Sequence, residues 1–339
     1  MKTIKIALAA AVLLVAVAAA ALFTLPRTTV KPPAPISVEI PRGIGSRGMA
    51  QLLAAKGVIA SPWHFLAARV LRPGLRLQAG LYDFSKEASA AEVLDRIARG
   101  DVHFDELTVP EGANIWEVSE LAAKLGWFSA DDFLTVARDP ALIAELLPDV
   151  RPAPASFEGY LFPSTYRLSN HSAPRQIITQ MLGEFHRVWS KLQAENLTKL
   201  PIPEAVTLAS LVEKETGLAD ERTIVASVYR NRLDSHMLLG CDPTTIYAAL
   251  LDGRYRGTIH RSDLDSDNPY NTYKHAGLPP GPIANPGEAS LRAALQPANT
   301  KFLYFVARGD GSGGHTFTAN AAQHNRAVAQ YRQAVAANK

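Results

Sequence analysis

One long apolar run at the N-terminus dominates the hydrophobic pattern of the chain. Residues Ile6 to Phe23 form eighteen consecutive apolar side chains, preceded by Lys2 and Lys5. At a rise of about 1.5 Å per residue, a helix of this length just crosses a hydrocarbon core of about 30 Å. The run therefore predicts a cytoplasmic tip and a transmembrane anchor over residues 1–25. A cleaved secretory signal is the alternative, because the alanines offer cleavage sites, although signal h-regions usually have only about 7 to 15 residues.

Both interpretations place the rest of the chain on the far side of a membrane. Lys2 and Lys5 stay on the cytoplasmic side by the positive-inside tendency, and no second apolar run of this length follows. Residues 26–36 are rich in proline, which favours an extended conformation. The sequence therefore predicts one membrane anchor, an extended linker and an exported body.

Beyond the linker, a βα pattern occurs twice, 69 residues apart, over residues 40–57 and 109–126. Each copy predicts a short strand, a glycine turn, an amphipathic helix and a glycine that ends the helix. A chance recurrence of a common βα pattern is the alternative. The pattern between the copies predicts a hairpin strand over 77–84 and a helix over 88–98. Residues 37–130 are therefore expected to form a small α+β region.

The remaining residues, 131–339, are expected to be mainly helical, with a C-terminal third rich in Gly, Pro and Asn. Apolar periodicity predicts helices over 131–147, 174–196 and 203–216, and a fourth helix capped by Asp220. A strand is predicted over 302–307. The fold class expected for the whole chain is α+β.

Composition excludes several classes of protein. The 339 residues are 47% hydrophobic and 20% charged, which indicates about two domains with buried cores and excludes a disordered chain. The net charge of +3, from 35 basic and 32 acidic residues, is too small and too evenly spread to indicate nucleic-acid binding. A lone Cys241 excludes a disulfide scaffold and a multi-thiolate zinc site. No metal-ligand spacing, nucleophile elbow or nucleotide fingerprint is present, so we expect no cofactor.

The helix predicted over 203–216 carries the clearest chemical signal. Leu208, Leu211, Val212 and Glu215 recur at i, i+3, i+4 and i+7, so Glu215 continues a stripe that faces the interior. Burial and the negative end of the helix dipole both raise the pKa of a carboxyl group. A raised pKa suits a general acid near neutral pH. Periodicity alone also fits a buried helix-end Glu with a structural role, and at this point both interpretations stay open.

Two other carboxylates are candidates to act beside Glu215. Glu213 is two residues back on the helix, so it faces another side and cannot easily flank the same bond. Glu158 is the better candidate, because it lies in the aromatic-rich loop 157–166. Aromatic rings beside Asn, Glu and Gly in loops suit a carbohydrate groove. Turn chemistry and core aromatics are the alternative explanation of these loops.

Seven short motifs occur in order along the chain. They are Glu158–Pro163 (EGYLFP), Glu213–Thr216 (EKET), Val225–Leu233 (VASVYRNRL), Asp242–Thr244 (DPT), Tyr270–Tyr273 (YNTY), Gly277–Gly281 (GLPPG) and His315–Phe317 (HTF). Together they resemble the motifs of the YceG-like endolytic murein transglycosylases. The resemblance covers nearly the whole chain, and in that family the small α+β region resembles a LysM module, which implies a LysM-like region over 37–130 and a catalytic domain over 131–339.

The resemblance implies a bacterial, single-pass inner-membrane protein with a periplasmic body that cuts nascent peptidoglycan strands internally. The implied reaction is non-hydrolytic cleavage of the β-1,4 bond between N-acetylmuramic acid and N-acetylglucosamine, which leaves a 1,6-anhydro end. Termination of glycan elongation is the role this reaction suggests. The implied partners are glycan strands and the membrane, with cell-wall synthases as candidates, and neither nucleic acid nor a cofactor is expected.

The resemblance also assigns residues to the site. The catalytic residue of the family is the second Glu of the E-K-E-T motif, here Glu215, which favours the acid/base interpretation over the structural one. Asn271 and Tyr273 resemble the Asn/Tyr loop that lytic transglycosylases place along the cleft, and we assign them to substrate binding. Glu158 and Tyr166, from the aromatic loop, are assigned to substrate binding with them.

The chain departs from the family pattern at one place. Gly240 and Cys241 precede the Asp-Pro-Thr motif, where the family usually has Gln followed by Ser or Thr. Two other functions remain as alternatives. One is a muramidase that uses water, with Glu158 or another carboxylate assisting Glu215. The other is a non-catalytic scaffold that binds peptidoglycan through the LysM-like region.

Overall fold

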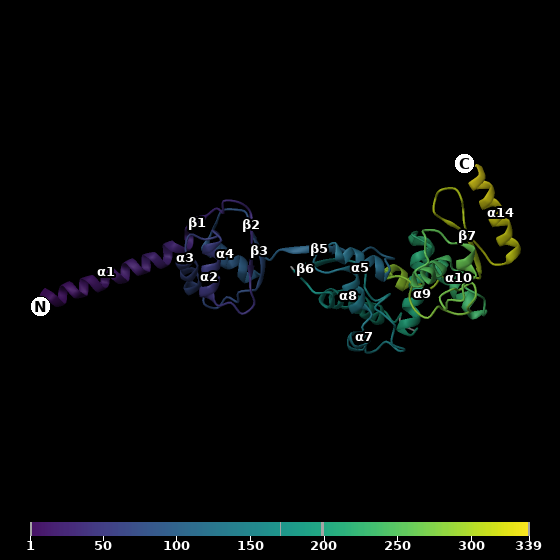
Figure 1. Cartoon of the computed structure of the whole chain (residues 1–339), viewed down its shortest axis with the longest axis horizontal. Helices are drawn as coiled ribbons and strands as arrows, with labels where there is room; N and C mark the ends of the chain where they lie inside the picture. Colours follow the sequence, from purple (N-terminus) through teal and green to yellow (C-terminus); the bar gives the residue numbers. More distant parts are fainter. Residues whose placement is uncertain (1, 170, 198–199, 338–339) are drawn as a thin grey trace. The chain divides into compact units, whose positions relative to one another are not determined.

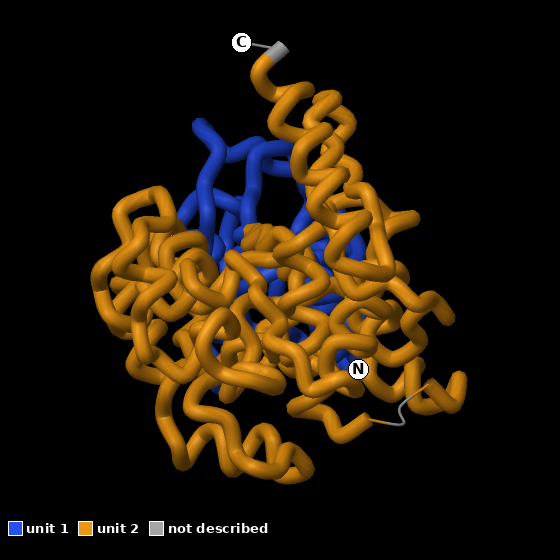
Figure 2. The backbone as a smooth tube through the Cα atoms, turned by 90° about the vertical axis from the view of Figure 1, so that its right-hand side faces the viewer, with its two compact units in different colours: residues 1–105, 167–171 blue, residues 106–166, 172–339 orange. Residues whose placement is uncertain are grey.

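The computed structural model describes residues 2–169, 171–197 and 200–337. The chain divides into two units, shown in blue and orange in Figure 2. Unit 1 comprises residues 1–105 and 167–171, and unit 2 comprises residues 106–166 and 172–339. Both units mix helices with short two-stranded sheets, which agrees with the predicted α+β class.

The N-terminal apolar run forms helix α1 (Lys2–Thr24), which continues into the 3₁₀ helix η1 (Leu25–Arg27). The segment Leu8–Arg27 has a mean hydropathy of 2.7, and the residues of α1 within it are not buried in the protein. Within the described part of the chain, this is the one helix long and apolar enough to cross a membrane. Its length and composition fit both a membrane anchor and a signal sequence.

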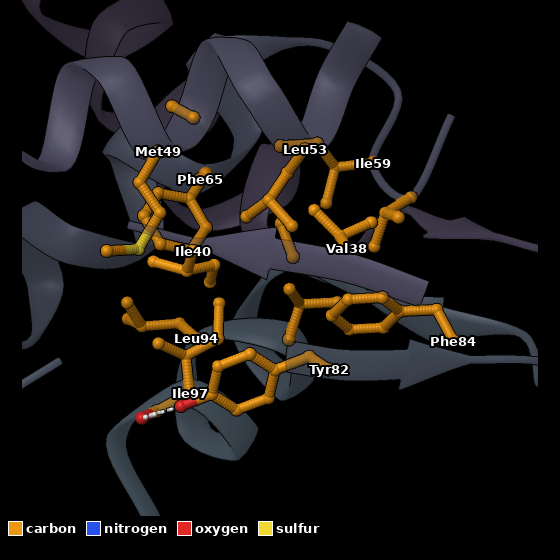
Figure 3. Packing of buried hydrophobic residues seen from close by; sticks show 14 of the residues in the cluster. Val38, Ile40, Met49, Leu53, Ile59, Phe65, Tyr82, Phe84, Leu94 and Ile97 are labelled. Carbon is orange, nitrogen blue, oxygen red and sulfur yellow. Dashed lines mark hydrogen bonds between the residues drawn. The ribbon is translucent and has the colours of Figure 1, made fainter. Parts of the chain in front are cut away.

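Unit 1 is built from small sheets and three helices around one apolar core. Strand β1 (Thr29–Val30) pairs with β4 (Ala88–Ser89), and β2 (Ile36–Ile40) pairs with β3 (Gly80–Phe84), both antiparallel. The helices are α2 (Ser46–Ala55), α3 (Pro62–Leu71) and α4 (Ala90–Arg99). Figure 3 shows the core between them, formed by Val38, Ile40, Met49, Leu53, Phe65, Tyr82, Leu94 and Ile97 among others.

The proline-rich residues 26–36 differ from the extended linker that the sequence predicts. Helix η1 packs on α3 and α4, and β1 pairs with β4. Pro26 and Pro32 are buried. The segment is therefore part of unit 1, because its apolar prolines and its backbone both find partners there.

The two copies of the βα pattern adopt the predicted order of elements. The first copy is β2, a turn at Gly43, α2 and Gly57, and the second is β5 (Phe104–Thr108), a turn at Gly112, α5 (Ile115–Ala123) and Gly126. All four glycines have positive φ, the conformation in which a glycine avoids Cβ strain.

The predicted boundary between the first region and the rest of the body lies elsewhere than expected. Strand β5 pairs with β6 (Thr165–Ser169), and the division between the units falls within these strands. Residues 106–130 belong to unit 2, because α5 packs on a helix of that unit. The chain therefore divides after Asp105, not after Ala130. The LysM-like character of the first region remains a prediction.

Unit 2 contains most of the helices. They are α5, α6 (Ala130–Ala137), α7 (Pro140–Leu146), α8 (Pro174–Ala194), α9 (Ile202–Glu215), η2 (Ala219–Glu221), α10 (Arg222–Asp234), α11 (Asp242–Leu251), α12 (Arg261–Leu264), α13 (Glu288–Leu295) and α14 (Ala321–Ala337). Strands β7 (Tyr304–Ala307) and β8 (His315–Thr318) form an antiparallel pair. Helix α9 packs on α10, α11 and α13, and every residue from 205 to 212 is buried. It is therefore the central helix of the unit.

Three local predictions differ from the structure. The single helix predicted over 131–147 is two helices, α6 and α7, because Pro140 cannot continue α6 and Asp139 caps α7 by accepting from the Ala141 N–H at 2.9 Å. Asp220 does not cap α10, because residues 219–221 form η2 and Glu221 directly precedes α10. The hairpin strand predicted over 77–84 forms the single strand β3, but its partner is the distant strand β2 and not an adjacent strand of a hairpin.

Replacing Gly159 by Ala tests the close packing of the aromatic loop on α9. Gly159 has φ +85°, and a Cβ there would overlap Pro282 and lie 2.8 Å from Val206 Cγ1. Gly126 has a similar φ of +76° with open space around it. We expect G126A to lower the free energy of unfolding by about 1–2 kcal/mol through backbone strain alone. G159A should cost about 1–3 kcal/mol more because it also overpacks the core.

The measurement is urea unfolding of the full-length protein in detergent, followed by tryptophan fluorescence. Equal losses of stability in the two variants would contradict the close contact of Gly159 with Pro282 and Val206.

Candidate active site

Helix α9 carries Glu215 at its last position, as the apolar stripe predicts. Leu208, Leu211 and Val212 are buried along this stripe. Glu215 itself is partly exposed as a residue, while protein atoms surround its carboxyl group. The helix ends here because Thr216 adopts an extended conformation. The carboxyl group is thus enclosed by protein atoms at the end of α9, while the residue as a whole is partly exposed.

The thiol of Cys241 lies against this carboxyl group. Cys241 Sγ donates a weak hydrogen bond to Glu215 Oε2 at 3.6 Å. Two threonines fix the backbone of Cys241: its N–H donates to Thr272 Oγ1 at 3.0 Å, and Thr244 Oγ1 donates to its carbonyl at 2.7 Å. The start of α11 and the loop before Tyr273 therefore hold the thiol in place beside Glu215.

Burial sets the electrostatics of Glu215. It raises the pKa of this carboxyl to about 7, and the negative charge of Asp242 acts in the same direction. The Tyr229 hydroxyl, the Cys241 thiol and His315 act in the opposite direction. The Tyr229 side chain is fully buried, and its hydroxyl makes no hydrogen bond of ordinary geometry to any described residue. Glu215 can therefore exchange a proton near neutral pH.

The buried carboxylate of Glu221 holds His315, which acts electrostatically on Glu215. Glu221 accepts from the His315 backbone N–H at 2.8 Å, and His315 Nδ1 lies 2.7 Å from Glu221 Oε2. Thr216, the neighbour of Glu215, donates to the same Glu221 oxygen at 3.4 Å. Burial raises the pKa of Glu221, but the His315 contacts outweigh it and the net shift is downward. The ring of Phe305 packs edge-on against both His315 and Tyr229.

Tyr273 reaches the other side of the site. Its hydroxyl donates to Asp242 Oδ1 at 2.5 Å, and the residue is 40% exposed. Asn271 is fully buried, and its side chain donates to the carbonyls of Leu264 and Ser266 and accepts from the Tyr273 N–H. Asn271 therefore shapes the loop that presents Tyr273, and its assignment to direct substrate binding remains a prediction.

Glu213 faces another side of α9, as its spacing from Glu215 predicts. Its Oε2 accepts from the Gly287 N–H at 2.9 Å, and its Oε1 lies 3.7 Å from Arg222. The carboxylate thus ties α9 to the start of α13 and to α10.

Glu158 lies inside the protein. It is 3% exposed, and its carboxyl group accepts from the Ile115 N–H at 2.9 Å, the Tyr247 hydroxyl at 3.1 Å and Asn285 Nδ2 at 3.2 Å. Burial raises its pKa to about 8 against the effect of these hydrogen bonds. Its contacts join the start of α5, α11 and the loop before α13, so the structure gives it a connecting role. Its assignment to substrate binding remains a prediction.

Tyr166 is also directed inward. It is 8% exposed, and its hydroxyl donates to the Phe162 carbonyl at 2.5 Å. Of the residues assigned from the sequence, the structure thus brings Glu215 and Tyr273 together around Cys241 and Asp242. Glu158, Asn271 and Tyr166 support neighbouring loops.

Sequence reasoning missed Cys241, Tyr229 and the pair of Glu221 and His315 as neighbours of the acid. Tyr229 could have been found, because it follows Val225 by four residues on the buried stripe of α10 and so carries a hydroxyl into the interior. The Cys241 and His315 contacts join distant parts of the chain and leave no local signal. Over the described ranges, no group of three or more His, Cys, Asp and Glu side chains is arranged to hold a metal ion.

Comparison with known proteins shows which family the chain resembles. Residues 38–330 match the YceG-like family. The chain is similar to the endolytic murein transglycosylase of Bacillus subtilis (strain 168), with 31% identity covering 87% of this chain and 84% of that protein. It is also similar to the endolytic murein transglycosylase of Streptococcus pneumoniae serotype 2 (strain D39), with 29% identity covering 87% of this chain and 58% of that protein.

A solved structure shows the same fold. The crystal structure of a yceG-like protein from Listeria monocytogenes matches with a TM-score of 0.60 and 31% identity, over 86% of this chain and 98% of that chain.

Thiol labelling tests the placement of Cys241. The residue is 1% exposed, and burial together with the Glu215 charge raises the pKa of its thiol well above the ordinary value. We expect iodoacetamide at pH 8 to label the folded protein more than about tenfold more slowly than the urea-unfolded protein, since each pKa unit changes the thiolate fraction about tenfold. C241S gives the background of the assay. Equal rates in the folded and unfolded protein would contradict the buried contact with Glu215.

Proposed function

The chain belongs to the YceG-like family, and we propose that it is an endolytic murein transglycosylase, which cuts peptidoglycan glycan strands internally. The observation that carries the proposal is Glu215. It is the second Glu of the E-K-E-T motif, it lies at the reachable end of a buried helix, and burial raises its pKa to about 7. Two curated relatives that match over 87% of this chain carry the name of this activity.

In the proposed reaction one carboxyl group takes part in two proton transfers, first as the acid and then as the base. Neutral Glu215 donates its proton to the oxygen of the β-1,4 bond as the bond from C1 of N-acetylmuramic acid to that oxygen breaks. The resulting carboxylate accepts the proton of the C6 hydroxyl of the same sugar, and O6 forms the new bond to C1. The products are a free hydroxyl on one strand and a 1,6-anhydro end on the other, with no water consumed.

The surroundings of Glu215 support a single-carboxyl mechanism. A glycoside hydrolase that uses water or a covalent intermediate needs a second carboxylate across the scissile bond. Glu213 is bound to Gly287 and Arg222 on another face of α9, and three protein donors enclose Glu158. Asp242 acts electrostatically on Glu215, but its Oδ1 already accepts from Tyr273. This arrangement favours the transglycosylase over the muramidase alternative.

A cavity lined by the ends of α5, α9 and α11 is the proposed place for the glycan strand. It has a volume of about 360 Å³, and its lining includes Lys214 and Pro243, which adjoin Glu215 and Asp242 in the sequence. Trp116, Tyr247 and Tyr255 also line it. Aromatic rings offer flat apolar surfaces for the faces of sugar rings. We assign this cavity to sugars next to the cleaved bond.

The location follows from α1. In this proposal α1 anchors the protein in the inner membrane and the body faces the periplasm, where nascent strands are made. The LysM-like part in this proposal is the portion of unit 1 that follows α1. Cleavage of a strand still attached to a cell-wall synthase would end its elongation.

Replacing Glu215 by Gln tests the acid and the product together. The full-length protein in detergent is incubated with un-crosslinked glycan strands, and mass spectrometry identifies the new ends. The wild type is expected to yield 1,6-anhydro ends, and E215Q should lose at least about 100-fold in rate because its amide cannot donate and accept the proton. Reducing ends would identify a hydrolase, and intact strands with the wild type would favour a binding scaffold.

The matched control is E204Q on the same helix. Glu204 is exposed in the first turn of α9, far along the helix from Glu215. It should keep full activity, which separates loss of the acid from disturbance of α9.

The pH dependence of the reaction tests the electrostatics of the site. Since Glu215 must begin protonated and burial raises its pKa to about 7, kcat/KM should fall about tenfold per pH unit on the alkaline side of that value. Asp242 contributes to the raised pKa, so D242N should lower the pKa of Glu215 and move the alkaline limb to lower pH. If the alkaline limb of the D242N profile moves to higher pH or does not move, Asp242 does not raise the pKa of Glu215.

A further inference from the structure

Helix α3 of unit 1 presents a large apolar surface to solvent. Trp63 is 71% exposed, Val70 64% and Leu71 41%. Seven residues are nearly two helical turns, so Trp63 and Val70 point the same way, and all three directions fall within about 100° around the helix. Phe65 and Ala68 on the opposite side are buried in the core of unit 1. The helix therefore has one apolar face inside the unit and a second one outside it.

The position of α3 relates this outer face to the candidate membrane span. Within unit 1, α3 packs against η1 and against α1, whose segment Leu8–Arg27 is the apolar span. Figure 1 shows α3 beside the end of α1. A helix that touches the end of a membrane span lies at the level where head groups begin. A tryptophan with an apolar ring and a polar N–H is typical of that level.

The charge of this part of the chain is strongly positive. Residues 26–80 contain eight basic side chains and one acidic side chain, Glu39, a net charge of +7 against +3 for the whole chain. The charge is therefore not evenly spread, contrary to the expectation from composition. The basic residues are Arg27, Lys31, Arg42, Arg47, Lys56, Arg69, Arg72 and Arg76. Among described residues, the one ion pair that these eight form joins Arg72 to Asp95.

Basic groups occur on α3 and directly after it. Residues 62–79, which are α3 and the segment after it, contain Arg69, Arg72 and Arg76 and no acidic residue. An anionic lipid surface attracts such basic groups, and its boundary with the acyl chains accepts Trp, Val and Leu. A hydrated anionic polymer would pair with the arginines but would leave Val70 and Leu71 in water.

We propose that the outer face of α3, defined by Trp63, Val70 and Leu71, docks on the head-group surface of the anionic bilayer that α1 crosses, with Arg69 beside this face and Arg76 in the segment after the helix as the basic groups that attract it. The inference rests on the membrane anchoring that is part of the proposed function, and it is independent of the reaction at Glu215. Docking would fix unit 1 on the membrane surface at a second point besides α1. It would thereby restrict how unit 1 tilts about the end of the span.

Quenching of Trp63 fluorescence by labelled lipids tests this proposal. Full-length protein is placed in nanodiscs of phosphatidylcholine alone, or of phosphatidylcholine with phosphatidylglycerol, with and without a quencher high on the acyl chains. The chain has four tryptophans, so the difference between wild type and W63F isolates Trp63. We expect this difference to be blue-shifted and quenched in the anionic discs and less quenched in neutral discs or at high salt. W116F, in unit 2, should leave the Trp63 component unchanged.

Charge variants separate docking from a chance position near the lipid. R69Q with R76Q should reduce the quenching of Trp63 in anionic discs by at least about twofold, because lipid attraction scales with the number of basic groups near the surface. R261Q is the matched control, since Arg261 is a highly exposed arginine of unit 2. Trp63 emission that stays unquenched and water-like in anionic discs would overturn the proposal. So would a blue shift that appears only when soluble glycan strands are added.

Carbonate extraction of cell membranes that contain the full-length protein distinguishes the two proposals. If carbonate releases the protein, the proposed membrane anchoring by α1 is wrong, and the proposed docking of α3 is wrong with it. If it is retained while Trp63 stays unquenched, docking alone is wrong. Loss of transglycosylase activity in a variant would test the role of Glu215, and it would not affect the conclusions on anchoring or docking.

Discussion

The constraint on which the catalytic unit depends is a carboxyl group kept from bulk water at the end of a buried helix. Removing a carboxylate from water is costly, so the group takes up a proton unless neighbours compensate. Glu215 meets this condition because α9 is buried from residue 205 to 212 and because α10, α11 and α13 pack around it. The loop at Cys241 then closes one side of the carboxyl group with a weak donor.

A second buried carboxyl group shows that a raised pKa alone does not identify the acid. Burial raises the pKa of Glu158 to about 8 and that of Glu215 to about 7. Three protein donors from separate segments occupy Glu158, including the Ile115 N–H at the start of α5, where a helix favours negative charge. Glu215 accepts a weak hydrogen bond from the Cys241 thiol, and the residue is partly exposed. The exposure of the residue, more than the pKa of its carboxyl group, separates Glu215 from Glu158.

The sequence was sufficient where a feature is periodic and local. The stripe that ends at Glu215, the opposite placement of Glu213 and the four glycines of the βα copies all follow from spacing along one element. Pro140 was a local signal as well, and it should have divided the helix predicted over 131–147. The cap predicted for Asp220 is wrong because residues 219–221 form η2 and α10 begins only at Arg222. The contact of Glu221 with His315, 94 residues away, leaves no trace in the local pattern. The hydrogen bonds that enclose Glu158 come from groups 43 to 127 residues away, so the local sequence could not predict them.

The opposing influences on Glu215 suit a group that must act as an acid and then as a base. A carboxyl group with a pKa far above the working pH would donate poorly and return a proton reluctantly, whereas one far below would begin ionised. Burial and Asp242 push the pKa upward, and Tyr229, Cys241 and His315 push it downward, so that it settles near 7. Asp242 is itself tied to Tyr273, and His315 to Glu221, so both influences are held by fixed contacts. A single group balanced in this way can serve both proton transfers of a reaction that consumes no water, and no second carboxylate is required opposite it.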